Sequence, residues 1–248
     1  MNGTLKLKTV LAGSKTVAED VYFTPPFKLY SPFYENGTAK FISMCAAAGT
    51  LAGDRHEIAL NIGDGCKVHF TDQGFQKLFD THGGSSSQTL NIRVGENAGL
   101  KYLPHPIMTF GGCVHTAVNT VDIKSSSELV FAEIYCCGRT AMGEEFALKR
   151  FHSRTEIRID GKADFIDNTL IEPENFPVKN LGFFEGRTHT GIMYVYSLYS
   201  DMYDNACKMC PKSDGEIQAA LSKTDRGFSV RAFSNSAENI QMFFQSLL

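Results

Sequence analysis

The sequence predicts a mainly β fold of stacked β-layers that resemble a β-helix, with a few short helices that include a C-terminal one. Strand-type alternation of polar and apolar side chains dominates from the first residues onward. A strand-turn-strand unit recurs at a spacing typical of stacked supersecondary units. Helical patterns are few. Because β folds of this size often form one unit, residues 1–248 are predicted to be a single domain.

The first predicted elements are short strands around a proline-rich segment. Residues 1–10 alternate polar and apolar side chains, and residues 41–44 continue an apolar run. Between them, residues 24–27 and 31–33 combine proline with aromatic side chains. Proline cannot donate a ladder hydrogen bond, so this segment is predicted to be an edge strand or a loop.

A weak repeat follows, in which two apolar positions flank a small polar turn. Its copies are residues 60–70, 92–102 and 121–131, where Ile62, Val94 and Ile123 take equivalent places. Their spacing of roughly 30 residues is in the range of stacked supersecondary units. The alternative is that any all-β protein produces such units by chance, and both interpretations predict β structure.

A hairpin and the helices complete the expected elements. Asp160-Gly161 between alternating arms is a strong signal for a two-residue β-hairpin turn. Helical patterns cover residues 75–80, residues 213–216 leading into 217–221, and residues 237–248. The last is the best defined, because Ser236 can cap it and one face is apolar, with Ile240, Phe243, Phe244 and Leu247 at helical spacing.

Charge and composition exclude several classes of protein. The net charge of −3 and the lack of clustered Lys and Arg argue against a nucleic-acid partner. No stretch has the apolar length of a signal peptide or a membrane span, so the protein is predicted to be cytoplasmic, with no membrane partner. The seven cysteines lack the even spacing of a disulfide framework and are expected to be mostly buried thiols.

Few residues form a recognisable catalytic or metal-binding pattern. Cys207 and Cys210 have the two-residue gap that lets both thiolates reach one metal ion, and His189 is a further weak candidate ligand. An incidental cysteine pair is the favoured interpretation, because no second ligand pair is present. We find no phosphate loop, dinucleotide fingerprint or nucleophile elbow, so the protein is predicted not to be an enzyme. A small zinc-dependent enzyme and a β-solenoid binding module without a metal role remain as alternatives.

Charged residues inside apolar, strand-like surroundings are the unusual feature. They are Asp54 and Arg55 after a Gly-rich turn, Glu133 in an apolar run, and Arg139 after a glycine. A buried charge needs a partner, so such residues usually form an internal ion network or line a wet channel. The alternative is that each lies on a solvated strand face.

Several segments together resemble the urease accessory protein family called UreD or UreH, most closely its Helicobacter-type UreH branch. The resemblance runs from about residue 23 to residue 186. Its clearest stretch is residues 133–146, which contain an acidic strand, a Gly-Arg turn and a Gly-Glu continuation. The matching segments are residues 23–29, 32–34, 49–55, 103–106 and 133–146.

This resemblance implies a non-catalytic, β-helix-like protein that binds the helical accessory protein UreF, through it the GTPase UreG, and also apo-urease, with a possible dimer of the complex. No cofactor would be bound permanently, and Ni²⁺ would pass transiently through an internal tunnel. Asp54 and Glu133 are the implied positions near the nickel path, since carboxylates suit Ni²⁺ as ligands. Arg55, Arg139 and Glu144 would hold turns and ion pairs.

Two further family positions have no evident role. Gln73 and Lys77 lie in residues 71–77, which resemble a family segment after the first repeat. The family's Gly-Gly before the acidic residue is replaced here by Ala52-Gly53, which removes one residue that freely takes positive φ. Little after residue 186 matches, so the C-terminal cysteines and helix gain no support from the resemblance.

Overall fold

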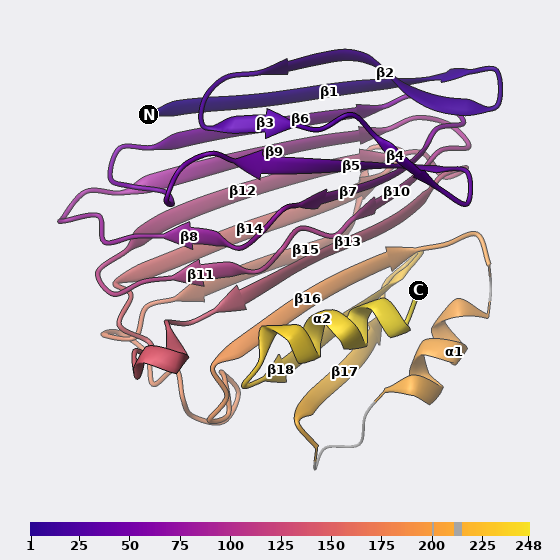
Figure 1. The fold of residues 1–248 in the computed structure, drawn as a ribbon. Coiled ribbons are helices and arrows are strands. Elements are labelled where there is room, and N and C mark those ends of the chain that lie inside the picture. The colour runs from indigo at the N-terminus through magenta and orange to yellow at the C-terminus, as the bar shows by residue number, and fades with distance from the viewer. Residues whose placement is uncertain (200, 211–214) are drawn as a thin grey trace.

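The computed structural model describes residues 1–199, 201–210 and 215–248. Two β-sheets lie one behind the other, and both α-helices lie on the side of the second sheet (Figure 1). Sheet A has the order β15 (Lys162–Ile171), β14 (Arg150–Ile159), β12 (Val114–Ile123), β9 (Ser86–Val94), β6 (Arg55–Ile62), β1 (Asn2–Ala12) and β2 (Lys15–Phe23). The main path of sheet B is β17 (Ile217–Lys223), β18 (Phe228–Ser234), β16 (His189–Tyr196), β13 (Glu128–Cys136), β10 (Gly99–Tyr102), β7 (Lys67–Asp72), β5 (Thr38–Cys45) and β3 (Phe27–Leu29). The short strands β4 (Phe33–Glu35), β8 (Gln76–Leu78) and β11 (Ile107–Thr109) pair onto this sheet.

The sequence repeat is the structural repeat. Each copy contributes one strand to sheet A and the next strand to sheet B, as in β6 and β7, β9 and β10, and β12 and β13. The equivalent residues Ile62, Val94 and Ile123 pair directly in parallel register. The chain therefore winds through stacked parallel rungs, and the predicted β-helix-like stacking is confirmed.

The hairpin and the proline-rich edge are also confirmed. Strands β14 and β15 are antiparallel, and their turn has Asp160 at φ 49° and Gly161 at φ 78°. Positive φ at both central residues is what a type I′ turn requires. The proline-rich segment holds β3, which is the outermost strand of sheet B.

One of the expected helices is confirmed and two are wrong. The C-terminal helix α2 (Ala237–Ser246) begins where predicted, and Ser236 Oγ accepts a hydrogen bond from the Asn239 amide at 3.3 Å. Residues 76–78 instead form β8, which pairs with β11, and residues 217–223 form β17, which pairs with β18. Strand partners distant in sequence override the local helical pattern at both places. Residues 213 and 214, the expected start of the second helix, lie outside the described residues.

A short helix that the sequence did not predict, α1 (Met202–Met209), precedes β17. Its buried residue Ala206 joins the apolar cluster that also holds the inner face of α2 and the outward side chains of β13, β16 and β18. A second apolar cluster fills the space between the two sheets. No helix in the described part of the chain is long and apolar enough to cross a membrane.

Candidate functional site

The interior between the sheets changes from apolar to polar along the strands. Neighbouring strands of sheet A turn a buried apolar row inward at the paired positions Leu60, Ile92, Val121 and Ile157. Nearer the starts of the same strands, the paired inward row is His56, Gln88, Ala117 and Ser153, all of them buried. Polar side chains in a β interior require hydrogen-bond partners, so this section of the interior is a candidate site.

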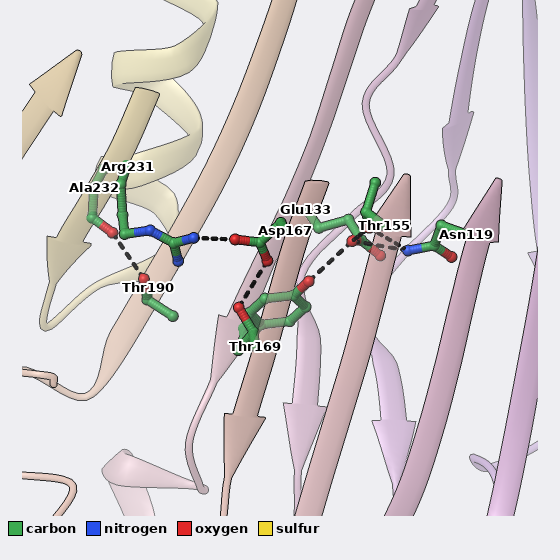
Figure 2. Close-up of polar contacts among 9 residues, drawn as sticks. Asn119, Glu133, Thr155, Asp167, Thr169, Thr190, Arg231 and Ala232 are labelled. Atoms are coloured by element: carbon green, nitrogen blue, oxygen red, sulfur yellow. Dashed lines mark hydrogen bonds and ion pairs between the residues drawn. The ribbon is translucent and has the colours of Figure 1, made fainter. Parts of the chain in front are cut away.

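Glu133 is at the centre of the polar section. It lies on β13 of sheet B and is only 4% exposed. Its Oε2 accepts hydrogen bonds from Asn119 Nδ2 at 3.0 Å, Thr155 Oγ1 at 3.2 Å and the Tyr135 hydroxyl at 2.9 Å. Because Asn119 and Thr155 belong to β12 and β14, the carboxyl group bridges the two sheets (Figure 2).

Burial dominates the electrostatics of this carboxyl group. It raises the pKa of Glu133 from 4.5 to about 7, and the three hydrogen bonds only partly oppose the rise. The nearby carboxylate of Asp167 acts in the same direction as burial. Glu133 therefore carries a proton in a large fraction of molecules at neutral pH.

An ion pair lies on the other side of this network. Asp167 on β15 accepts hydrogen bonds from Arg231 on β18 and from Thr169 Oγ1, the latter at 2.8 Å (Figure 2). Asp167 is buried, and its guanidinium partner neutralises it where the last strand of sheet A meets sheet B. At β15 the polar section of the interior therefore ends in the ion pair between Asp167 and Arg231.

A cavity of about 370 Å³ connects the polar section to the surface. The buried side chains of Glu133 and His56 and the half-buried side chain of Asp72 line it, together with the exposed side chains of Cys45 and Phe75. Its lining therefore reaches from the surface to the carboxyl group that bridges the sheets.

The cavity holds a second carboxyl group, that of the half-buried Asp72. Ser43 Oγ donates a hydrogen bond to Asp72, but burial raises the pKa of Asp72 to about 6. Two imidazole nitrogens of the lining, His56 Nε2 and His105 Nδ1, are buried and have no hydrogen-bond partner within the described chain. Burial lowers the pKa of both histidines, so their neutral, metal-binding form predominates.

These donors are dispersed along the cavity. In the parts of the chain that the structure describes, no group of three or more His, Cys, Asp or Glu side chains is close enough to hold a metal ion. Single carboxylate and imidazole donors along a cavity suit brief contacts with a cation better than a permanent metal centre.

The structure brings three of the sequence-predicted residues to this cavity. Glu133, Gln73 and Lys77 all line it. The backbone N–H of Gln73 donates a hydrogen bond to the backbone carbonyl of Ser43 at 2.8 Å, which fixes the segment beside Asp72. Gln73 and Lys77, whose role the sequence left open, are therefore wall residues of the cavity.

Asp54 and Arg55 are outside the cavity lining. The carboxylate of Asp54 accepts the Leu51 amide at 2.8 Å and the ammonium group of Met1. Burial opposes ionisation of Asp54, but these hydrogen bonds outweigh it and lower its pKa. Arg55 is exposed at the start of β6. The charge of Asp54 acts on two residues of the cavity lining, His56 and Cys45, and it favours a higher pKa at both.

Arg139 and Glu144 brace a turn at one end of the solenoid. Arg139 Nε and Nη2 donate to Glu144 at 3.2 and 2.5 Å, and Glu144 also accepts the Gly111 amide at 3.2 Å. The guanidinium lies 4.6 Å from the Phe110 ring centre. These contacts hold the 3-10 turn of residues 140–142 in place.

The C-terminal candidates are dispersed. His189 is buried on β16, with Nδ1 2.7 Å from Thr188 Oγ1. Cys207 is exposed on α1, and the Cys210 thiol donates to the Ala219 carbonyl at 3.3 Å. These residues do not form a group of metal ligands within the described chain.

Sequence reasoning missed Asp72, His56, His105 and Asn119. Strand alternation carried a signal for three of them. Asp72 shares the inward face of β7 with Val68 and Phe70, His56 shares that of β6 with Ile58 and Leu60, and Asn119 shares that of β12 with Val121 and Ile123. His105 lies outside the strands, so no such pattern pointed to it.

Comparisons with known proteins give a consistent result. The family model described as UreD urease accessory protein matches residues 1–248. The urease accessory protein UreH of Helicobacter pylori strain J99 is 38% identical over 221 residues, which cover 88% of this chain and 83% of that protein. The urease accessory protein UreD of Acetivibrio thermocellus is 30% identical over 242 residues, covering 96% and 92%. The UreD of Staphylococcus aureus strain bovine RF122 is 27% identical over 247 residues, covering 96% and 88%.

Proposed function

This chain belongs to the UreD urease accessory protein family, and we propose that it serves urease maturation as a non-catalytic scaffold that conducts nickel to the urease active site. In this proposal it works in the cytoplasm, binds a UreF-type helical protein and through it a UreG-type GTPase, and docks on apo-urease. Ni²⁺ is its cargo and is not held permanently.

The polar cavity is the observation that carries the nickel part of the proposal. An apolar core stabilises a β-solenoid without ionisable groups, yet this interior holds Glu133 and Asp72 at a stability cost. Both line one cavity with the unpartnered nitrogens of His56 and His105. Carboxylate and neutral imidazole are donors that Ni²⁺ accepts, and their dispersal favours passage over retention.

The residues would act in sequence along the cavity. Exposed Cys45 and half-buried His105 lie toward the surface, and Glu133 is at the inner end of the lining. A cation that reaches Glu133 favours the ionised carboxylate, so binding there releases the proton that burial keeps on this group at neutral pH. Asn119, Thr155 and Tyr135 then orient the carboxylate toward the cavity.

The experiment that tests the proposal separates assembly from nickel transfer. We expect the wild-type chain to co-purify with a UreF-type partner and to restore nickel to urease in cells that lack the endogenous chain. The double variant Asp72→Asn, Glu133→Gln keeps the shape of the cavity wall while removing its charge, so we expect it to bind the partner normally and to lower the nickel content of urease. Glu57→Gln, which changes an exposed carboxylate on β6, is the matched control.

Nickel per urease active site, measured by mass spectrometry of purified urease, decides between outcomes. Normal nickel content with the double variant would refute the cavity as the nickel path. A chain that never forms a complex with the partner would refute the scaffold.

A further inference from the structure

Two cysteines at the end of helix α1 have no part in the proposed function. Cys207 lies in the last turn of the helix, and Cys210 directly follows the helix. Cys207 is exposed and Cys210 is half-buried. A structural zinc ion takes four protein ligands, and no group of three metal ligands includes these cysteines within the described chain. A disulfide bond, in contrast, needs only the two sulfur atoms.

The backbone brings Cys207 and Cys210 within reach of a disulfide bond. The Cys210 N–H donates a hydrogen bond to the Cys207 carbonyl at 3.4 Å, which closes a turn between the two residues. In a hydrogen-bonded turn of this kind, the first and last Cα atoms are less than about 7 Å apart. A disulfide joins residues whose Cα atoms are roughly 4.4–6.8 Å apart. Burial, and then the nearby Cys207, raise the pKa of the Cys210 thiol, which agrees with this proximity.

The Cys210 thiol makes a contact that oxidation removes. It donates a hydrogen bond to the Ala219 carbonyl at 3.3 Å. Ala219 lies on β17, the outermost strand of sheet B, and packs on the apolar cluster that includes Ala206 of α1 (Figure 1). A disulfide sulfur carries no proton and cannot donate to this carbonyl. The oxidation state of the pair therefore determines whether the end of α1 is hydrogen-bonded to the edge of sheet B.

The other five cysteines compete poorly for oxidation. All seven lie in the described part of the chain, where Cys66, Cys113, Cys136 and Cys137 are buried. Burial raises the pKa of Cys113 and of Cys136 to about 12, so neither forms the reactive thiolate at neutral pH. Cys45 is exposed, but the cysteine nearest to it in sequence is the buried Cys66. Among the described residues, only the pair at α1 combines an exposed thiol with a second cysteine one turn away.

We propose that Cys207 and Cys210 are a redox site, which forms a reversible disulfide by exchange with a low-molecular-weight disulfide such as oxidised glutathione. The Cys207 thiolate attacks one sulfur of the small disulfide, whose S–S bond breaks and releases one thiolate. Cys210 then gives up its proton and attacks the Cys207 sulfur, which forms the Cys207–Cys210 bond and releases the second thiolate. The two protons lost by the protein pass to these thiolates. The protein is thus oxidised by two electrons, and the small disulfide is reduced to two thiols.

This site goes beyond the proposed scaffold function, because neither nickel transfer nor partner binding requires it. It adds a response to the thiol-disulfide balance of the surroundings, and the contact between Cys210 and Ala219 is the part of the fold that changes.

Peptide mapping tests the proposal, because Lys208 lies between the two cysteines. The purified full chain is equilibrated with mixtures of reduced and oxidised glutathione, free thiols are blocked with iodoacetamide, and a tryptic digest is analysed by mass spectrometry. Trypsin cleaves after Lys208, so the two resulting peptides stay joined only where the disulfide is present. We expect joined peptides in most molecules from the oxidising mixtures and separate peptides after reduction with dithiothreitol.

Serine variants identify the sulfur atoms that react. Serine is close in size to cysteine and keeps a donor toward the Ala219 carbonyl, so Cys207→Ser and Cys210→Ser should fold normally. We expect neither variant to give joined peptides, and we expect Cys210→Ser to stop at a mixed disulfide between Cys207 and glutathione. Cys45→Ser, at the other exposed cysteine, is the matched control and should behave like the wild type. Hydrogen-deuterium exchange in α1 and β17 should rise when the wild type is oxidised and stay unchanged in Cys207→Ser.

Each outcome has a separate meaning. Joined peptides that form reversibly and disappear in both serine variants support the redox site. A wild-type chain that keeps glutathione on Cys207 without joined peptides overturns it, because Cys210 then does not complete the exchange. A bond from Cys207 to Cys45, or no reaction at Cys207, overturns it as well. Unchanged hydrogen-deuterium exchange after the disulfide forms overturns the effect on β17.

Discussion

Replacing Glu133 by glutamine changes how the stability of the protein depends on pH. The pKa of Glu133 is raised from 4.5 to about 7 in the folded chain, chiefly by burial. An acid whose pKa is raised by folding stabilises the fold fully below its unfolded pKa and loses that contribution as the pH rises through the folded pKa. The wild type should therefore lose stability between pH 5 and pH 8 through this group, and Glu133→Gln should not.

The magnitude follows from the two pKa values. At 1.36 kcal/mol per pH unit, the gap between 4.5 and about 7 corresponds to roughly 3 kcal/mol of unfolding free energy. The wild type loses most of this stability between pH 5 and pH 8. Glutamine keeps an oxygen where Asn119, Thr155 and Tyr135 donate, so the network stays formed. The variant should be close to wild type at pH 5 and more stable by up to about 3 kcal/mol at pH 8.

Urea unfolding at several pH values measures this difference. The chain has no tryptophan, so far-UV circular dichroism is the suitable signal. The raised pKa of Asp72 affects wild type and variant alike and cancels in the comparison. Glu57→Gln, at an exposed position, should show no such change. Parallel stability profiles of wild type and Glu133→Gln from pH 5 to pH 8 would refute the reasoning.

Three further changes test other parts of the structure. Gly138→Ala should destabilise the fold by about 2 kcal/mol or more, because Gly138 has φ 129° and an added Cβ would lie 2.2 Å from the Glu144 carbonyl oxygen; a lowered Tm reports it. Ser236→Ala removes the cap that accepts the Asn239 amide and should cost about 1 kcal/mol, or roughly 3 °C in Tm. Burial lowers the pKa of His115 to about 4, so its neutral form stabilises the fold above pH 6.5 and this contribution is lost toward pH 4; relative to His115→Asn, the wild type should lose roughly 3 kcal/mol over that range in urea unfolding.

The rungs of the solenoid could be predicted because their determinants are local and repeated. Ile62, Val94 and Ile123 were equivalent in sequence and are paired in space, since parallel stacking places equivalent residues of successive rungs side by side. The Asp160-Gly161 turn was equally local, because its backbone conformation depends on two residues.

The candidate site could be predicted only in part. The sequence marked Glu133 as a charge in apolar surroundings, and the structure places it in the interior. Its partners Asn119 and Thr155 come from the opposite sheet, and no local pattern encodes which residues face each other across two layers. The same limit explains β8 and β17, where a distant strand partner determined the backbone conformation.

Stability and function make opposite demands on Glu133. Near neutral pH its ionised form is disfavoured by burial, while many apolar side chains fill the rest of the interior and offset that penalty. A purely structural role would favour glutamine, which satisfies the same donors without a charge. If Glu133→Gln is more stable at pH 8 and also delivers less nickel to urease, the carboxylate is retained for its charge toward the cavity, as expected where activity opposes stability. If the variant gains stability and delivers nickel normally, the charge has no role in transfer and the path must follow other donors, first among them Asp72.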